Sequence, residues 1–170
     1  HHRPPASQES AGLPCRSPDK GEGGIVSIQK QNHTMLFAGS VSISSGHRVD
    51  MLPEILLNVR KTIPDAQLII AGSGDDEHTL RERFERLHLQ DAVVWHGRFS
   101  LDDIASLVIN SSVLIDPIDA SIANRAKSSF RVALALAYGM PIVTSNIGIR
   151  TAMIPKELQK MFFAKPADVN

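Results

Sequence analysis

The segment NRAKSSFR, residues 124–131, gathers basic and hydroxyl side chains just before an apolar run, VALALAY. The run predicts a helix that begins next to the two serines. Free backbone amides and the helix dipole make the start of a helix a favourable place for an anion. We therefore expect a phosphate or diphosphate to be bound by Arg125, Lys127, Ser128, Ser129 and Arg131.

A structural interpretation of the same segment stays open. Ser128 or Ser129 would then only cap the helix, and the basic side chains would lie on solvated surface. Arg131 favours a binding site, because it is the only charged side chain of the predicted helix. The helix is otherwise apolar on almost every side, so we expect it to be central in the fold.

Two other loops follow predicted strands and carry candidate ligands. In the loop GSVSISSGHR, Gly39 and Ser40 are placed where backbone amides can face a phosphate or diphosphate. Gly72 and Gly74 are candidate nucleotide-binding residues, although glycine at these positions also suits a simple tight turn. Arg98 is a further candidate for the nucleotide, because it lies on the loop side of the predicted sheet.

The sequence lacks the patterns of several other functional classes. It contains no GxGxxG fingerprint, no GxxxxGK[ST] loop and no HExxH motif. The single cysteine, Cys15, leaves no disulfide framework and no zinc-binding pattern, which fits a reducing, cytoplasmic setting. We expect no metal and no cofactor, and no catalytic nucleophile or base can be named.

Composition favours one globular domain. The chain has 170 residues, 42% hydrophobic and 21% charged, which are ordinary values for a packed protein. Its 18 basic and 18 acidic side chains give no overall field that would attract nucleic acid. No apolar run approaches the roughly 18 residues that a membrane-spanning helix needs. We expect a soluble protein without a transmembrane segment.

Short apolar runs alternate with amphipathic segments from residue 35 onward. The runs are almost continuously apolar, which is typical of strands covered on both faces of a parallel sheet. The predicted strands are 35–39, 67–72, 92–97, 112–117, 141–145 and 161–166, and the predicted helices are 50–62, 76–89, one capped by Ser100 and Asp103, and 130–138. This alternation predicts an α/β fold with a doubly wound, Rossmann-like parallel sheet, whose ligands bind beyond the carboxyl ends of the strands.

Two parts of the chain differ in composition. Residues 1–33 are rich in Pro, Gly, Ser and charge and have no apolar periodicity, so they are predicted to be a flexible tail or linker. Residues 34–170 carry the periodic elements and form the predicted Rossmann-like domain, for which the resemblance described next implies nucleotide-sugar binding.

Four motifs, in this order, resemble the C-terminal, donor-binding domain of GT-B glycosyltransferases of the retaining family 4 (group 1) type. They are FAG at 37–39, PDAQLIIAGSG at 64–74, VVWHG at 93–97 and ALAYGMPIVTS at 135–145. The resemblance spans roughly Met35 to Asp168. Each motif is short, but their order and spacing together are specific.

Both carboxylates of the family's E-x7-E motif are missing. The first glutamate falls at Ala126 and the second, which the resemblance implies would bind ribose hydroxyls, falls at Leu134. A variant of the family carries P.K..E before this helix, and Arg131 falls at that lysine.

The basic residues of the family's first loop are also replaced. The motif GRL...KG becomes GSV and SG, with His47 or Arg48 as candidate substitutes. Arg125 and Lys127 would then supply the charge that the first loop has lost.

The resemblance implies the donor half of an enzyme that transfers a glycosyl group from a nucleotide-diphosphate sugar without a metal. It also implies a partner, an N-terminal acceptor-binding Rossmann domain outside this chain, and a domain truncated at its C-terminus. We therefore expect this chain alone to be inactive. The alternative is a degenerate, non-catalytic Rossmann module for binding or assembly, which the loss of both glutamates favours. A sugar-nucleotide epimerase of the same fold would need carboxylate and histidine catalysts that the sequence does not place.

Overall fold

The computed structural model describes residues 33–164, so nearly all of the predicted tail and residues 165–170 lie outside the described residues. One six-stranded sheet has the order β3-β2-β1-β4-β5-β6, and every strand pair is parallel. The predicted doubly wound α/β fold is confirmed. The strands are β1 (Thr34–Ala38), β2 (Gln67–Ala71), β3 (Val93–Gly97), β4 (Val113–Asp116), β5 (Ile142–Ser145) and β6 (Phe163–Ala164).

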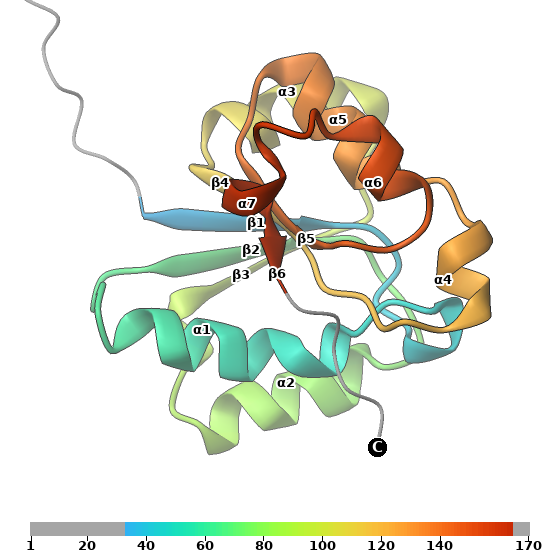
Figure 1. Ribbon diagram of the computed structural model, residues 1–170. Helices are drawn as coiled ribbons and strands as arrows, with labels where there is room; N and C mark the ends of the chain where they lie inside the picture. The colour runs from blue at the N-terminus through green and yellow to red at the C-terminus, as the bar shows by residue number, and fades with distance from the viewer. Residues whose placement is uncertain (1–32, 165–170) are drawn as a thin grey trace, which may run out of the picture.

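Helices cover both faces of the sheet (Figure 1). On one face lie α1 (Leu52–Arg60) and α2 (Glu77–Arg86), and on the other α3 (Leu101–Ile109), α5 (Phe130–Tyr138) and α6 (Ile149–Met153). Helices α1, α2, α3 and α5 match predicted helices. No prediction covers the short helices α4 (Ile122–Ala126), α6 and α7 (Gln159–Phe162), nor the 3-10 turns Ile43–Ser45, Val49–Met51 and Gln90–Ala92.

Strand β1 lies at the centre of the sheet and is buried along its whole length. Because successive side chains of a strand point to opposite faces, Phe37 packs in the apolar cluster on the α1 and α2 side, whereas Leu36 packs in the cluster on the α3 and α5 side. Both side chains are 0% exposed. The core is therefore two apolar layers separated by the sheet, which holds the carboxyl ends of its strands in fixed positions.

Helix α5 begins and ends where its sequence predicts. Ser129 is the N-cap and accepts a hydrogen bond from the backbone of Val132, and Gly139 ends the helix with a φ of 63°. The expectation that α5 is central is wrong, however. Leu136 is 50% exposed and Tyr138 is 48% exposed, because only one side of the helix packs on the sheet.

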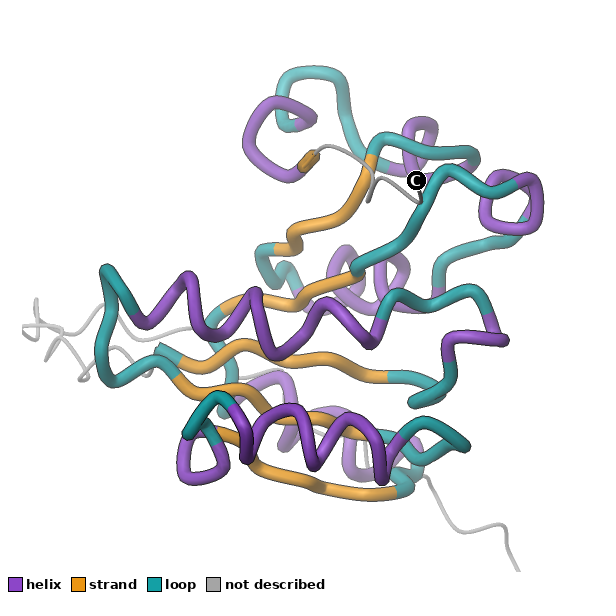
Figure 2. Tube along the Cα trace, turned by 90° about the horizontal axis from the view of Figure 1, so that it is seen from below, coloured by secondary structure: helices purple, strands orange, loops and turns teal. Residues whose placement is uncertain are grey.

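The order of the strands creates one switch point. The chain leaves β1 toward α1 and leaves β4 toward the opposite face, although β1 and β4 are neighbours in the sheet. Seen from the side of α1 and α2, these helices lie across the sheet and leave β5 uncovered on that side (Figure 2). In open α/β sheets such a switch point opens a crevice at the carboxyl ends of the strands, and the candidate site lies there.

Candidate functional site

A polar pocket of about 220 Å³ opens at the carboxyl end of β1, beside the start of α5. It brings together segments that lie far apart in the sequence. Its lining residues are Ala38, Gly39, His47, Asn124, Lys127, Ser128, Ser129, Phe130, Arg131 and Arg150. Five of the predicted diphosphate-binding residues, Gly39, Lys127, Ser128, Ser129 and Arg131, are therefore adjacent in space.

Asp116, the last residue of β4, is the centre of a buried polar network next to this pocket. It is 0% exposed. Its carboxylate accepts hydrogen bonds from Arg131 Nε (2.7 Å), Arg150 Nε (2.7 Å), Thr144 Oγ1 (2.9 Å) and Ser129 Oγ (3.1 Å). Burial raises the pKa of Asp116, but the charges of Arg131 and Arg150 and their hydrogen bonds prevail and lower it to about 2. The carboxylate is therefore ionised at neutral pH.

Arg131 extends from α5 under the first loop and is 3% exposed. Besides Asp116 it contacts the β1 carbonyl of Ala38 through Nη1 (3.0 Å) and His47 Nδ1 through Nη2 (2.7 Å). A guanidinium only donates, so His47 Nδ1 is the acceptor and His47 is neutral. Gly39 is required above this side chain, because an added Cβ would collide with Arg131 Nη1.

The neutral state of His47 has two main causes. Burial lowers its pKa most, and the neighbouring charge of Arg131 lowers it further, to about 4. His47 therefore does not add a positive charge to the pocket at neutral pH, and it does not balance one.

Arg150, on the short helix α6, is the second buried arginine and was not among the predicted site residues. It is 2% exposed. Its Nε is bound to Asp116, and Nη1 lies 3.5 Å from the backbone oxygen of Asn124. Nothing in the sequence around Arg150 marks it, because its partner Asp116 lies 34 residues away.

The rim of the pocket is built by the segment 124–129. Asn124 is 1% exposed and donates through Nδ2 to the Gly46 carbonyl (2.8 Å), which fastens the first loop to α4. Lys127 reaches the same loop, where its Nζ donates to the Ser45 carbonyl (2.8 Å). Ser129 is buried as the cap of α5, whereas Ser128 is exposed. Of the two serines, Ser129 therefore has the structural role and Ser128 faces solvent.

The other predicted residues lie outside the pocket lining. Arg125 donates through Nε to the Ala120 carbonyl (3.1 Å), and Ser40 is exposed beside Gly39. Arg98 contacts Ser73 Oγ through Nε (3.2 Å), next to Gly72 and Gly74 at the ends of β2 and β3.

Glycine at positions 72 and 74 has a clear packing role. An added Cβ at Gly72 would overlap the carbonyl oxygen of Gly39, and one at Gly74 would overlap that of Val41. The backbone of the second loop therefore passes directly against the first loop. The assignment of Gly72 and Gly74 as nucleotide-binding residues stays a prediction.

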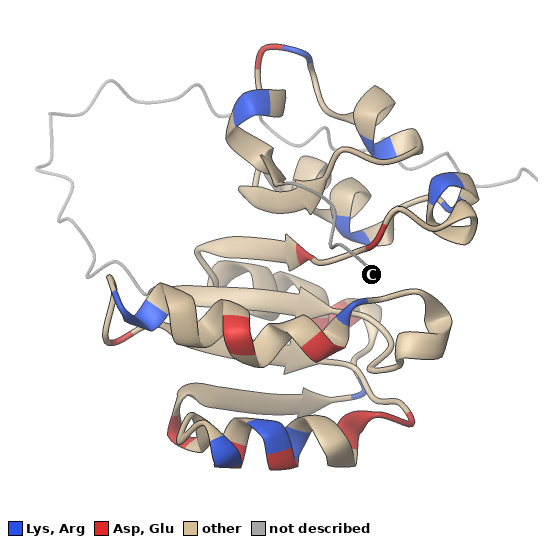
Figure 3. Ribbon diagram, turned by 60° about the horizontal axis from the view of Figure 1, so that its bottom comes forward, with Lys and Arg blue, Asp and Glu red and all other residues tan. Residues whose placement is uncertain are grey.

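Basic positions predominate in the part of the molecule built from α4 to α7, whereas α1 and α2 carry both signs of charge (Figure 3). Asp116 is the only carboxylate paired with Arg131 or Arg150 among the described residues. Two buried guanidinium groups therefore share one carboxylate, and Lys127 adds a further positive charge at the rim.

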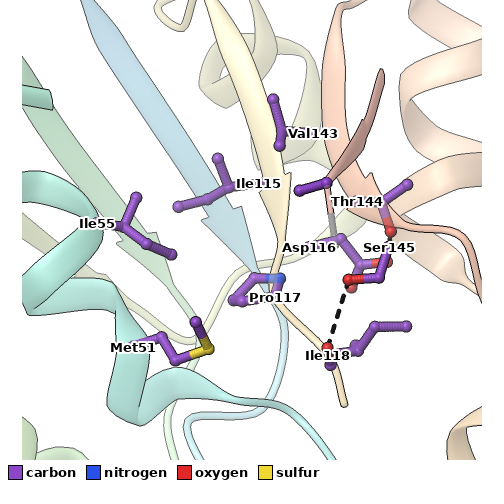
Figure 4. A pocket seen from close by; sticks show the side chains of 10 residues that line it. Met51, Ile55, Ile115, Asp116, Pro117, Ile118, Val143, Thr144 and Ser145 are labelled. Carbon is purple, nitrogen blue, oxygen red and sulfur yellow. Dashed lines mark hydrogen bonds between the residues drawn. The ribbon is translucent and has the colours of Figure 1, made fainter. Parts of the chain in front are cut away.

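A second pocket, of about 200 Å³, lies on the α1 side of β4 and β5 (Figure 4). Its walls are mainly apolar, with Met51, Ile55 and Val143 among its lining residues. An apolar pocket of about 290 Å³ adjoins it, and the two pockets share the lining residues Ile55, Ile115 and Val143. These walls offer few donors to a phosphate, so the polar pocket remains the candidate site.

Two features are absent from residues 33–164. No group of three or more His, Cys, Asp or Glu side chains in this range is arranged to hold a metal ion. No helix in the same range is long and apolar enough to cross a membrane.

The fold is that of GT-B glycosyltransferases of known structure. The chain superposes on the pneumococcal O-GlcNAc transferase GtfA, in complex with UDP and GlcNAc, with a TM-score of 0.65 and 18% identity, over 84% of this chain and 26% of that one. It superposes on Alr3699/HepE of Anabaena, in complex with UDP and glucose, with a TM-score of 0.59 and 18% identity, over 81% and 35% of the two chains.

The sequence itself matches glycosyltransferases. It is 27% identical over 136 residues to the uncharacterized glycosyltransferase MJ1607 of Methanocaldococcus jannaschii, which covers 78% of this chain and 32% of that protein. The chain thus spans about a third of this relative. Residues 32–170 match the family described as Glycosyl transferases, group 1. By this match over most of its length, the chain belongs to the group 1 glycosyl transferase family.

Proposed function

We propose that this chain is the donor-binding part of a retaining, family 4 glycosyltransferase and that its polar pocket binds the diphosphate of a nucleotide sugar. The observation that carries the proposal is the buried excess of positive charge at the switch point of the sheet. Arg131 and Arg150 are both almost fully buried and share the single carboxylate of Asp116. Buried charge is costly unless it is paired, so an anion in the pocket would complete the charge balance.

The chemistry follows from where negative charge develops. When the bond between the sugar and the diphosphate breaks, the nucleoside diphosphate leaves with increased negative charge. Preorganised cations and helix amides stabilise such a leaving group better than mobile water does. Lys127 at the rim and the start of α5 at Ser128 supply this environment beside the arginines. The acceptor would be held by an N-terminal Rossmann domain outside this chain, in a cytoplasmic enzyme.

The solved neighbours support the class of donor. The pneumococcal transferase and the Anabaena protein were both crystallised in complex with UDP and a sugar. We propose a nucleotide-diphosphate sugar, with UDP as the first nucleotide to test, as the donor of this chain too.

One observation favours the rival function, a degenerate binding or assembly module. The position of the family's second glutamate is occupied by Leu134, which is 7% exposed and packs in the apolar cluster with Ile104 and Leu107. The position of the family's first glutamate is occupied by Ala126, which is exposed and carries no carboxylate. Neither residue can bind ribose hydroxyls, so the nucleotide would depend on its diphosphate for affinity.

Calorimetric titration of the full chain with UDP, GDP, ADP and uridine tests the proposal. We expect at least one nucleoside diphosphate to bind, with an affinity that falls as salt is raised, because the attraction is charge-assisted. Uridine should bind at least about tenfold more weakly than UDP, since it lacks the diphosphate. Absence of binding by every nucleotide at millimolar concentration would favour the degenerate module.

A further inference from the structure

The two buried arginines differ in how many of their donors are already used. All three guanidinium nitrogens of Arg131 donate to protein acceptors, namely Asp116, the Ala38 carbonyl and His47. Arg131 is also held against the ring of Phe37, with Cζ 5.0 Å from the ring centroid. A side chain tied in this way has little left to offer a ligand.

Arg150 is placed differently. Its Nε donates to Asp116 at 2.7 Å, and Nη1 makes only a long contact, 3.5 Å, with the Asn124 carbonyl. No acceptor within residues 33–164 is bound by its Nη2, and this nitrogen is not one of the buried side-chain atoms without a partner. Because the side chain is 2% exposed and lines the polar pocket, Nη2 reaches the pocket surface, where it is open to an oxygen acceptor of a ligand.

The local charge balance points to the same residue. Asp116 carries one negative charge and serves both arginines. His47 accepts a hydrogen bond from Arg131 and is neutral, so it cancels nothing. One positive charge in the network is therefore not compensated by the described residues, and the guanidinium with unused donors is that of Arg150.

We infer that Arg150, and not Arg131, is the guanidinium that binds the phosphate oxygens, and that Asp116 holds Arg150 at the wall of the pocket. This inference rests on the proposed function, because it names the ligand of the same anion site. The planar guanidinium suits the site, since its Nη donors can engage two phosphate oxygens at once.

A pair of charge-conserving variants tests the inference on the full chain, with inorganic pyrophosphate and UDP as the probes. Arg150→Lys keeps the positive charge beside Asp116 but removes the Nη donors, so we expect the affinity for both probes to fall at least about tenfold. Arg131→Lys is the comparison variant, since it alters the same ion-pair network. It should lower the melting temperature and weaken binding of both probes, but several-fold less than Arg150→Lys does.

The outcomes separate this inference from the proposed function. If the wild-type chain binds both probes and Arg150→Lys retains its affinity, or Arg131→Lys loses more, the assignment of Arg150 is wrong while the proposed function stands. If pyrophosphate binds through Arg150 but no nucleotide binds, the anion site is real and the proposed function is wrong. If neither probe binds, both are wrong.

A measurement on the unaltered protein avoids any folding defect in the variants. In ¹⁵N spectra of the arginine side chains, saturation with pyrophosphate should shift the Nη signals of Arg150 and leave those of Arg131 almost unchanged. A larger shift at Arg131 than at Arg150 would overturn the inference.

Discussion

At the scale of single residues, Asp116 is the side chain on which the site depends most. It joins β4 to α5 through Arg131 and Ser129, and to α6 through Arg150. Breaking a buried ion pair by removing one partner costs roughly 3–5 kcal/mol, because the other charge is left uncompensated. The charges that prepare the pocket for an anion are thus also part of what holds this half of the fold together.

The pKa of His47 predicts how stability depends on pH. Because the folded protein lowers this pKa from 6.5 to about 4, the unfolded chain takes up a proton between these values and the folded chain does not. Protonation therefore favours unfolding, so stability should fall as pH is lowered from 6.5 to 4. Because His47 is only partly buried and solvent screens its charge, the loss should be roughly 1–2 kcal/mol. Urea unfolding at several pH values measures this loss.

The control for this prediction is His47→Asn, whose amide oxygen can still accept from Arg131 but does not titrate. Stability of the variant should vary less over the same pH interval. An identical pH dependence in the two proteins would show that His47 is not the group responsible. At lower pH both proteins should lose stability as pH falls from 3.8 toward 2, because Asp116 takes up a proton in the unfolded chain while it stays ionised in the folded protein.

At the scale of elements, α5 combines a buried side, a start that lines the polar pocket and an exposed apolar side. Leu134 is 7% exposed, whereas Leu136, two residues later, is 50% exposed. Leu134→Ala should cost roughly 2–5 kcal/mol, because it leaves a cavity in the core, and Leu136→Ala should stay within about 0.5 kcal/mol of the wild-type protein. Denaturant unfolding of both variants measures the difference, and equal losses would contradict the described packing of α5.

The ends of several elements could be predicted because local chemistry sets them. Ser129 caps α5 and Gly139 ends it in a left-handed conformation, and both signals are visible in the sequence. Ser100 and Asp103 form the predicted capping box of α3, where the Ser100 amide donates to the Asp103 carboxylate (2.7 Å). Helices α4 and α6 have five residues each and show no apolar periodicity, so no sequence pattern marks them.

The site was only partly predictable for a related reason. Lys127, Ser128 and Ser129 are neighbours in sequence at a helix start, so their grouping follows from local structure. Asp116 and Arg150 meet only because parallel strands bring their carboxyl ends to one edge, and sequence spacing carries no sign of that contact. The exposed side of α5 was missed because an apolar composition does not tell which side of a helix packs.

At the scale of the whole molecule, the described residues form a six-stranded Rossmann-like sheet, and the chain corresponds to a minor part of its relatives. It spans 32% of the Methanocaldococcus protein and 26% of the pneumococcal transferase. The polar pocket offers cationic and hydroxyl groups, and the imidazole in its lining, His47, and the neighbouring carboxylate of Asp116 are both hydrogen-bonded to Arg131.

We therefore predict that this chain alone transfers no sugar. Incubation with UDP-, GDP- or ADP-sugars and simple acceptor sugars should release no nucleoside diphosphate above a blank without protein. Hydrolysis or transfer by the 170-residue chain would show that donor chemistry does not require a second domain. A denatured sample of the same preparation controls for contaminating enzymes.

The central claim, that the pocket between β1 and α5 binds a nucleoside diphosphate, is tested most directly by mapping backbone amide shifts in NMR spectra during a titration with UDP. If UDP binds in the polar pocket, saturable shifts are expected at Gly39, Ser128 and Phe130, which line it. Amides of Val59 and Ile63, which line the apolar pocket beside α1, should not move. Saturable shifts confined to the apolar pocket, or no shifts at millimolar UDP, would contradict nucleoside diphosphate binding in the polar pocket.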